Sequence, residues 1–371
     1  MPEPVPFTDI QMDEAIVDRV AEVLHSGRYV KGPVVERFED RFAAACGVDH
    51  AVAVDSGTAA ILLALKGAGI GAGDEVFVPG HTFFATVSPV LSVGATPVFV
   101  DVDPETYGMD VAALSEALDA ASDPAAILPV HLYGCMADVR RIRELAAEHD
   151  AAVIEDACQA HFATRDGFTA GTAGTAGAFS FYPTKNMTVA GDGGMLVTDD
   201  PDVARRARRH RNHGRDADGR HRVLGLNHRM SEVHAAVGLE QLDRIDDWNE
   251  GRATAARRYS ARLADLDRVE TPTEPPGAEH VYHLYVIRVP AADRDPLREH
   301  LGDAGIETGI HYPTPAYDHD PVVERLGERS LPATESVCRR IVSLPIHPRI
   351  TDEEVDRVCT AVERYFEGAA A

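Results

Sequence analysis

The chain of 371 residues contains very little lysine. Only Lys31, Lys66 and Lys185 stand among its 36 basic residues, so arginine supplies almost all of the positive charge. Cysteine is also scarce: the 5 cysteines are odd in number and never spaced Cys-X-X-Cys, which argues against a disulfide framework or a zinc site and for a reducing cytosol. Long apolar runs and an export signal are missing too. We therefore expect a cytoplasmic protein with no metal centre and no membrane partner.

Positive charge of any kind is outweighed by acidic residues. The chain has 60 aspartates and glutamates and a formal net charge of −24, which argues against a nucleic-acid partner. Together with the shortage of lysine, this acidity favours adaptation to high salt, as in the proteins of halophiles. A GC-rich genome is the alternative explanation for the arginine, but it does not account for the acidity.

Strands and helices are expected to alternate along about the first half of the chain. A hydrophobic content of 44% is typical of a globular protein. The length of 371 residues is more than one compact core usually holds. Up to about residue 200, short apolar runs alternate with helical patterns, which predicts an α/β fold: a mostly parallel sheet with helices on both faces. We expect residues 1–245 to form this large domain, with an N-terminal helical segment, and residues 246–371 to form a smaller α+β domain. One long helical stretch, Glu232–Leu263, would link the two.

Lys185 lies in a loop between two strand-like runs, Phe179–Tyr182 and Met195–Thr198. An arginine stays charged in a protein, whereas a lysine amine becomes neutral once it is desolvated or placed beside another cation. A lysine retained at a strand end therefore suggests a nucleophile that forms a Schiff base with an aldehyde cofactor or a carbonyl substrate. The alternative is an ordinary surface lysine in a turn.

Two further segments have the pattern of a ligand site. Ser56-Gly57-Thr58 joins a strand to a helix start, where free N–H groups and the helix dipole favour a phosphate; Ser56 or Thr58 could instead serve only as the helix cap. Glu155 and Asp156 end an apolar strand, at the edge where open α/β sheets bind ligands. Because neighbouring residues of a strand point to opposite faces, we expect only one of these two carboxylates to face the site.

These motifs, taken together, resemble a known family. The segments SGT, EDACQAH, SFYPTKN followed by GDGG, and LNHRM are similar, in this order, to those of the DegT/DnrJ/EryC1/StrS family of pyridoxal-phosphate sugar aminotransferases. The resemblance covers nearly the whole chain and implies the type I aminotransferase fold. Asp192 stands where the family usually has Glu, Phe162 where it usually has Gly, and His228 at the second Tyr of YNYRM.

The resemblance assigns roles around the cofactor ring. It implies that Lys185 binds pyridoxal 5′-phosphate covalently and acts as the general acid and base. Phe83 would stack on the ring, and Asp156 would keep its nitrogen protonated so that the ring accepts electrons. Gln159 would form a hydrogen bond on the side of the ring hydroxyl.

The same resemblance assigns a phosphate site and a substrate side. Gly57, Thr58, Ala59 and Ser180 would hold the cofactor phosphate. Asn227 would reach the phosphate site of a neighbouring subunit, which implies a homodimer with shared active sites. Candidates for contact with the substrate are Tyr29, Lys31, His311 and Tyr312, and His131 is expected to be structural.

The implied reaction is transamination from an amino acid, glutamate or glutamine, to a keto group of a nucleotide-linked sugar. A sugar dehydratase on the same scaffold is one alternative, but in those family members a histidine replaces the lysine, so Lys185 argues against it. A cyclitol (inosose) aminotransferase stays open. A non-catalytic regulator that binds the cofactor would need a nucleic-acid-binding segment, and the chain shows no basic extension.

Overall fold

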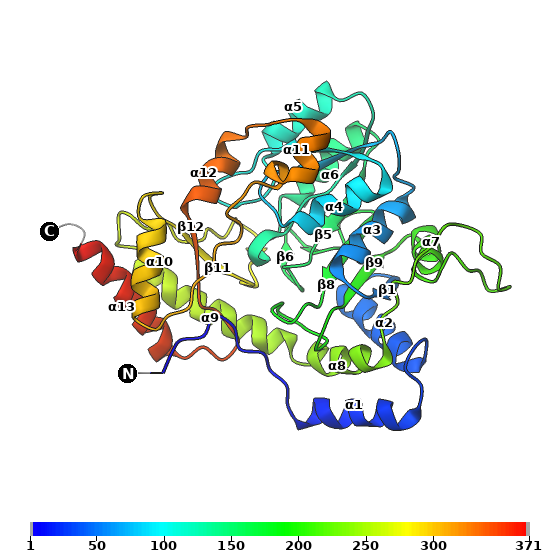
Figure 1. Cartoon of the computed structure of the whole chain (residues 1–371), viewed down its shortest axis with the longest axis horizontal. Helices are drawn as coiled ribbons and strands as arrows, with labels where there is room; N and C mark the ends of the chain where they lie inside the picture. Colours follow the sequence, from blue (N-terminus) through cyan, green and yellow to red (C-terminus); the bar gives the residue numbers. More distant parts are fainter. Residues whose placement is uncertain (1–2, 369–371) are drawn as a thin grey trace.

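A seven-stranded sheet forms the centre of the molecule (Figure 1). The computed structural model describes residues 3–368. The strand order is β1-β9-β8-β5-β4-β2-β3, and only β9 is antiparallel to its neighbours, β8 and β1. The strands are β1 His50–Val54, β2 Glu75–Pro79, β3 Thr96–Val100, β4 Pro124–Ile127, β5 Ala152–Asp156, β8 Ala176–Ser180 and β9 Gly194–Thr198. The expected mostly parallel sheet is thus confirmed.

Helices cover both faces of this sheet. Because side chains alternate along each strand, Val52 and Val54 of β1 pack on one face with α3 and α7, while Ala51 and Ala53 pack on the other with α2. A further cluster joins Phe77 of β2 to α5 and α6. These helices, together with α4, are α2 Pro33–Cys46, α3 Gly57–Ala68, α4 Phe84–Val93, α5 Val111–Ala120, α6 Val139–Glu148 and α7 Pro201–Arg211.

Two helical expectations differ from the structure. The first helix, α1 (Glu14–Ser26), begins later than the apolar pattern from Ile10 suggests, because the Asp13 side chain accepts the Ile16 N–H and caps it. The single helix expected over Glu232–Leu263 is two, α8 (Glu232–Leu242) and α9 (Ile245–Leu263). The Asp243 N–H bonds to the Gln241 carbonyl at this break, and apolar side chains continue on both sides of it.

A second sheet lies in the C-terminal part of the chain. Strand β11 (Tyr285–Arg288) pairs antiparallel with β12 (Ile341–Leu344), and both pack with α9, α10 (Arg294–Asp303) and α13 (Asp352–Gly368) around one apolar cluster. Helices α11 (Asp320–Leu326) and α12 (Pro332–Arg340) instead pack on the cluster of the central sheet. The remaining elements are short: β6 Thr164–Arg165, β7 Phe168–Thr169, β10 Ala278–Glu279 and the 3₁₀ turns η1 Leu132–Gly134 and η2 Ala316–Asp318. The division at residue 245 therefore stays a prediction.

Among the residues described, no helix is both long and apolar enough to cross a lipid bilayer.

Candidate active site

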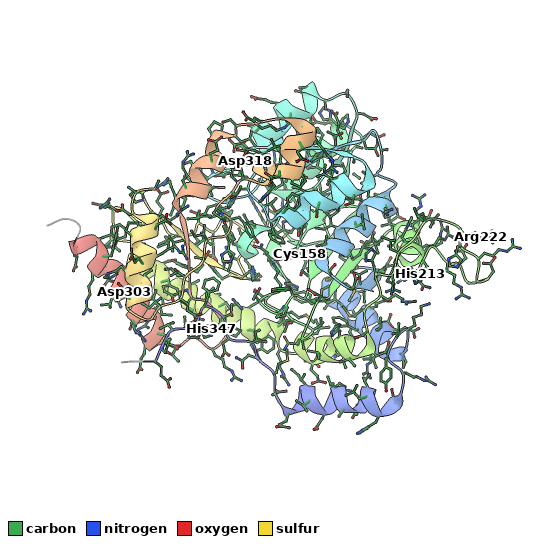
Figure 2. The ribbon with its side chains drawn as sticks, viewed as in Figure 1. Cys158, His213, Arg222, Asp303, Asp318 and His347 are labelled. Carbon is green, nitrogen blue, oxygen red and sulfur yellow. The ribbon has the colours of Figure 1, made fainter. Side chains whose placement is uncertain are left out.

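A cavity of about 560 Å³ opens where the strands of the central sheet end. The starts of α3 and α4, the ends of β5 and β8, and segments of the C-terminal part around His283 and Tyr312 form its walls. Cys158, near the centre of Figure 2, lies on the wall as well. Of the nine residues assigned to the cofactor from the sequence, seven line this cavity: Gly57, Thr58, Phe83, Asp156, Gln159, Ser180 and Lys185. The substrate candidates His311 and Tyr312 line it as well.

Lys185 lies in a turn that follows β8, with its backbone N–H bonded to the Tyr182 carbonyl at 2.8 Å. Its side chain is partly buried and faces the cavity rather than open solvent. Burial lowers the pKa of this amine below the ordinary value for lysine, while Cys158 and the Asp156 carboxylate pull it upward. A larger fraction of the amine is therefore neutral near pH 7 than for a surface lysine.

The adjacent carboxylates of β5 point in opposite directions, as the strand alternation predicts. Asp156 lines the cavity, where its Oδ2 accepts the Thr86 hydroxyl at 2.7 Å and its Oδ1 accepts the Cys158 N–H at 3.1 Å. Glu155 is fully buried on the other side and accepts the N–H groups of Ala173 and Gly174 at 2.7 and 2.8 Å. Asp156 is thus the one carboxylate of the pair that could meet a ligand.

Glu155 is also the hydrogen-bond partner of His131. The His131 Nδ1 accepts the Ala137 N–H at 3.2 Å, so its Nε2 carries the proton that is donated to Glu155 over 2.8 Å. Both partners are completely buried, and His131 serves as a structural residue, as expected.

The start of α3 forms a tight cradle against β8. Ser56 is the cap of the helix, and its hydroxyl accepts the Ala59 N–H at 3.1 Å. A Cβ at Gly57 would lie 2.7 Å from the Ser180 Cβ and 2.8 Å from the Cys158 Sγ, so only glycine fits. The N–H groups of Gly57 and Thr58, in the first turn, have no acceptor within the helix and are free for an anion.

Ala59 and Asn227 do not line the cavity. Ala59 is buried inside α3, and its N–H is already used by Ser56. Asn227 is exposed at the base of the loop that follows α7 and carries His213 and Arg222, which projects from the body of the molecule (Figure 2). Tyr29 and Lys31 are likewise exposed and lie outside the cavity wall.

Phe83, Gln159 and Tyr312 lie close together in the lining of the cavity. Phe83 is 54% exposed, and its ring centroid lies 5.3 Å from that of Tyr312. Gln159 is buried; its Oε1 accepts the Tyr133 N–H and its Nε2 donates to the Tyr312 hydroxyl, both at 2.9 Å.

Sequence reasoning missed several residues of this site. Thr86, which donates a hydrogen bond to Asp156, lies in the first turn of α4 and looks in the sequence like any helical threonine. His283 also lines the cavity; its Nδ1 is 3.2 Å from the Asn186 Oδ1, and burial, with Lys185 nearby, keeps its pKa well below the usual range. Its place in an apolar strand-like run, VYHLYVIR, gave no signal of a ligand site.

The geometry fits pyridoxal phosphate. A lysine whose pKa is lowered by burial, a carboxylate fixed by a hydroxyl, an exposed aromatic ring and a helix start with free N–H groups share one cavity. The family model of the DegT/DnrJ/EryC1/StrS aminotransferases matches residues 10–363. The chain belongs to this family.

Named relatives of this DegT/DnrJ/EryC1/StrS aminotransferase resemble it over nearly their whole length. The dTDP-3-amino-3,4,6-trideoxy-alpha-D-glucose transaminase of Streptomyces venezuelae is 42% identical, over 98% of this chain and 96% of the relative. The solved structure of DesV from S. venezuelae superimposes with a TM-score of 0.94 at 42% identity, over 98% of this chain and 99% of that one. NtdA from Bacillus subtilis, solved with bound cofactor PMP, has a TM-score of 0.90 at 32% identity, over 99% and 86% of the two chains.

The DegT/DnrJ/EryC1/StrS aminotransferases depend on pyridoxal phosphate, and this enzyme is a transaminase that uses the same cofactor. The fold is that of the solved sugar aminotransferases.

Proposed function

We propose that the protein transfers an amino group from glutamate or glutamine to a keto group on a nucleotide-linked sugar. One observation carries the proposal: Lys185, Asp156 and the Gly57–Thr58 helix start, far apart in sequence, face the same cavity. The relative from Streptomyces venezuelae, which is named as a transaminase of a dTDP-linked amino sugar, supports the choice of acceptor.

Each side chain has a separate duty in this proposal. Pyridoxal phosphate, when bound, supplies a conjugated ring that takes up the electron pair released at the α-carbon of the donor. Lys185 holds the cofactor and then, as a free amine, moves the proton between that α-carbon and the cofactor's C4′. Because burial lowers the pKa of the Lys185 amine, more of it is in the unprotonated form that can accept a proton. Asp156, whose Oδ2 accepts the Thr86 hydroxyl, would keep the ring nitrogen protonated.

The other residues bind and orient. Gly57, Thr58 and Ser180 would hold the phosphate, and Phe83 would pack on the ring. Gln159 would donate its remaining amide hydrogen on the hydroxyl side of the ring. Ala59 contributes only packing, because its N–H is bonded to Ser56.

The enzyme is further proposed to act as a homodimer, in which Asn227 reaches the phosphate site of a second copy. Leu224 and Leu226 beside it are 86% and 54% exposed, and such apolar side chains are suited to an interface. Sedimentation at micromolar concentration tests this: a dimer is expected that Asn227→Ala leaves intact while its affinity for the cofactor falls. A fully active monomer would contradict the shared site.

The direct test of the function uses Lys185→Ala. The purified wild-type protein should show the absorbance of lysine-bound pyridoxal phosphate and convert a keto-sugar nucleotide and glutamate into an amino sugar, detected by mass. Lys185→Ala should lose both. Lys66→Ala, at the far end of α3, is the matched control and should retain both.

The product separates the alternatives. A deoxy sugar would indicate a dehydratase, turnover of an inosose would indicate a cyclitol aminotransferase, and cofactor binding without turnover of any donor would indicate a regulator. Each of these results would replace the proposed reaction.

The acidity and the low lysine content support adaptation to high salt, and the cysteine pattern supports a location in a reducing cytoplasm. Circular dichroism during desalting tests this adaptation. Loss of the fold at low salt is expected, and full stability there would count against it.

A further inference from the structure

We propose that Tyr133 is a positioning residue that fixes Tyr312 at the mouth of the cavity, and that it acts on the nucleotide-sugar acceptor rather than on the amino-acid donor. Tyr133 is fully buried behind the cavity wall and does not line the cavity itself. This inference rests on the proposed function.

A buried chain of hydrogen bonds gives the Tyr133 hydroxyl one direction. Burial raises the pKa of the Cys338 thiol to about 12, so the thiol stays protonated and donates to the His81 Nδ1, 3.4 Å away. Burial also lowers the pKa of His81 to about 3, so the ring is neutral and its single proton lies on Nε2. Nε2 is 2.7 Å from the Tyr133 oxygen and donates to it.

Tyr133 consequently donates its own hydroxyl proton onward. The acceptor is the backbone carbonyl of His311, the residue before Tyr312. The chain runs Cys338 to His81 to Tyr133 to His311, and each donor meets one acceptor. Elements far apart in sequence (α12, the loop after β2, η1 and the 311–312 segment) are joined in this way.

A second path leads from the Tyr133 backbone to the Tyr312 side chain. The Tyr133 N–H donates to the Gln159 Oε1 and the Gln159 Nε2 donates to the Tyr312 oxygen, both at 2.9 Å. Tyr312 therefore receives one hydrogen bond, and its own O–H has no acceptor among the described residues. Since Tyr312 lines the cavity, this O–H is available to a ligand.

The backbone of Tyr133 is strained in a way that serves these contacts. Its φ of 60° lies in the left-handed region, which bulky residues rarely adopt. Gly134 follows with φ 104°, and a Cβ there would lie 2.8 Å from the His283 N. This turn directs the Tyr133 N–H to Gln159 while its carbonyl accepts the Leu284 N–H at 3.2 Å.

The position of the 311–312 segment points to the acceptor. His311 and Phe7, whose rings stack 5.6 Å apart, line both the cavity and a second, more open groove that includes Arg298 and Thr308. An amino-acid donor is small enough for the inner cavity alone. A nucleotide-linked sugar is longer, and the groove that shares His311 and Phe7 with the cavity offers room for its remaining part. On this proposal, a shift of Tyr312 weakens binding of the acceptor more than binding of the donor.

The test measures the two half-reactions of Tyr133→Phe holoenzyme separately. The half-reaction with glutamate, followed by absorbance, should stay within twofold of wild type. The KM for the keto-sugar nucleotide should rise at least tenfold. Equal effects on both half-reactions, or no effect on the acceptor KM, would overturn the inference. Tyr259→Phe is the control, because it removes a buried hydroxyl that donates to the Pro345 carbonyl at 2.9 Å in the C-terminal core.

A milder pair of variants tests the same chain of hydrogen bonds if Tyr133→Phe does not fold. Cys338→Ala removes the donor that fixes the His81 proton and should raise the acceptor KM about threefold. Cys338→Ser restores a donor and should return it to the wild-type value. Equal values for alanine and serine would contradict the chain of hydrogen bonds. Wild-type enzyme that aminates no keto-sugar nucleotide would instead refute the proposed function, so the two failures are distinguishable.

Discussion

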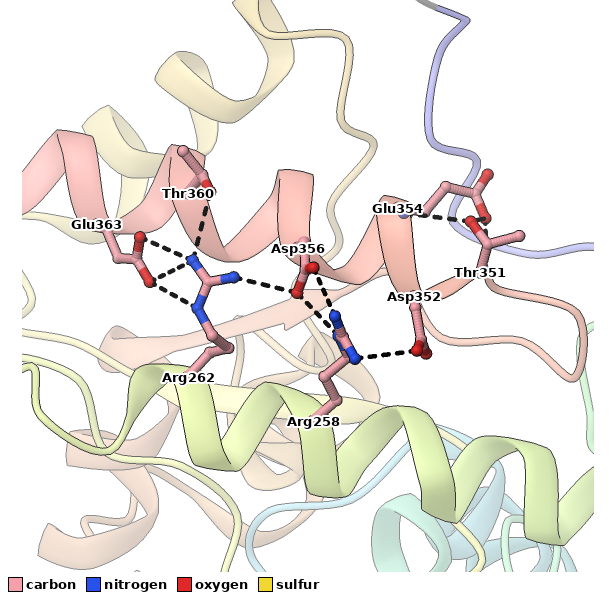
Figure 3. A network of polar contacts seen from close by, with 8 residues as sticks. All are labelled: Arg258, Arg262, Thr351, Asp352, Glu354, Asp356, Thr360 and Glu363. Atoms are coloured by element: carbon pink, nitrogen blue, oxygen red, sulfur yellow. Dashed lines mark hydrogen bonds and ion pairs between the residues drawn. The ribbon is translucent and has the colours of Figure 1, made fainter.

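Two polar networks in this protein work in opposite ways. On the surface, Arg258 and Arg262 of α9 bind the carboxylates of Asp352, Asp356 and Glu363 on α13 (Figure 3). Behind the cavity, Cys338, His81 and Tyr133 are neutral and buried, and single hydrogen bonds link them.

Exposure decides what each network contributes. The side chains of Arg258 and Arg262 in Figure 3 are about a third exposed, so water and salt compete for every ion pair. Removal of one partner therefore leaves the other in contact with water. Behind the cavity, a lost partner leaves a buried polar group without compensation. The surface network therefore tolerates change, whereas the buried one fixes geometry.

The largest expected effect concerns the two adjacent carboxylates of β5. Asp156→Asn should lower kcat by at least about 100-fold, because an amide cannot keep a ring nitrogen protonated, with little loss of stability. Glu155→Gln should instead lower stability and leave kcat of the folded fraction nearly unchanged. It weakens the buried hydrogen bonds from Ala173 and Gly174, at a cost of about 2 kcal/mol or more of unfolding free energy. Thermal unfolding and kcat are measured for both. Similar profiles for the two variants would contradict the division of roles.

A smaller effect is expected at the residue that holds Asp156. Thr86→Val removes the hydroxyl 2.7 Å from the Asp156 Oδ2 and should lower kcat/KM about tenfold, or about 1.4 kcal/mol of transition-state stabilisation. Thr334→Val is the matched control, since it removes a buried hydroxyl that donates to Asp101 at 2.8 Å. Identical kinetics in the two variants would show that Thr86 does not orient Asp156.

The pH dependence of Lys185 is a third test. In the cofactor-free protein, burial lowers the pKa of the amine, so the neutral, reactive form persists to lower pH than in free lysine. Acylation of Lys185 is quantified by mass spectrometry across pH. The pH at which it reaches half its maximum should therefore be lower than the corresponding pH for the ε-amine of Nα-acetyl-lysine. Asp156→Asn removes a charge that raises this pKa and should move the midpoint lower still. A midpoint pH equal to or above that of Nα-acetyl-lysine would refute the effect of burial on the pKa.

The smallest effect is expected on the surface. Arg262→Gln should lower the Tm by less than about 3 °C, and the difference should shrink as salt screens the pairs. Arg257→Gln, which breaks a pair within α9 alone, is the control. A decrease in Tm that is several times larger and independent of salt would show that this surface network stabilises the fold as strongly as the buried one.

Local patterns made much of the fold predictable. Apolar strands, the small-residue turn at Ser56–Thr58 and the alternation of Glu155 and Asp156 are properties of short segments, and the structure has them where the sequence indicates. The break between α8 and α9 was not predictable, because the helical apolar pattern continues through it. The start of α1 was placed four residues early for the same reason: the pattern extends beyond the Asp13 cap.

The supporting residues of the site could not be predicted, for a different reason. Thr86 holds Asp156 from 70 residues away, and Tyr133 holds His311 across 178 residues. Neither contact leaves a periodic or compositional trace, since each depends on how the sheet brings distant loops together. The residues meant to touch the cofactor were found through a family resemblance, while the residues that orient them emerged from the packing.

The most direct test of the central claim is reduction of the holoenzyme with borohydride, followed by digestion and mass spectrometry. The account predicts a single pyridoxyl-phosphate adduct, on Lys185. An adduct on Lys31 or Lys66, or none in an enzyme that still transfers amino groups, would contradict it.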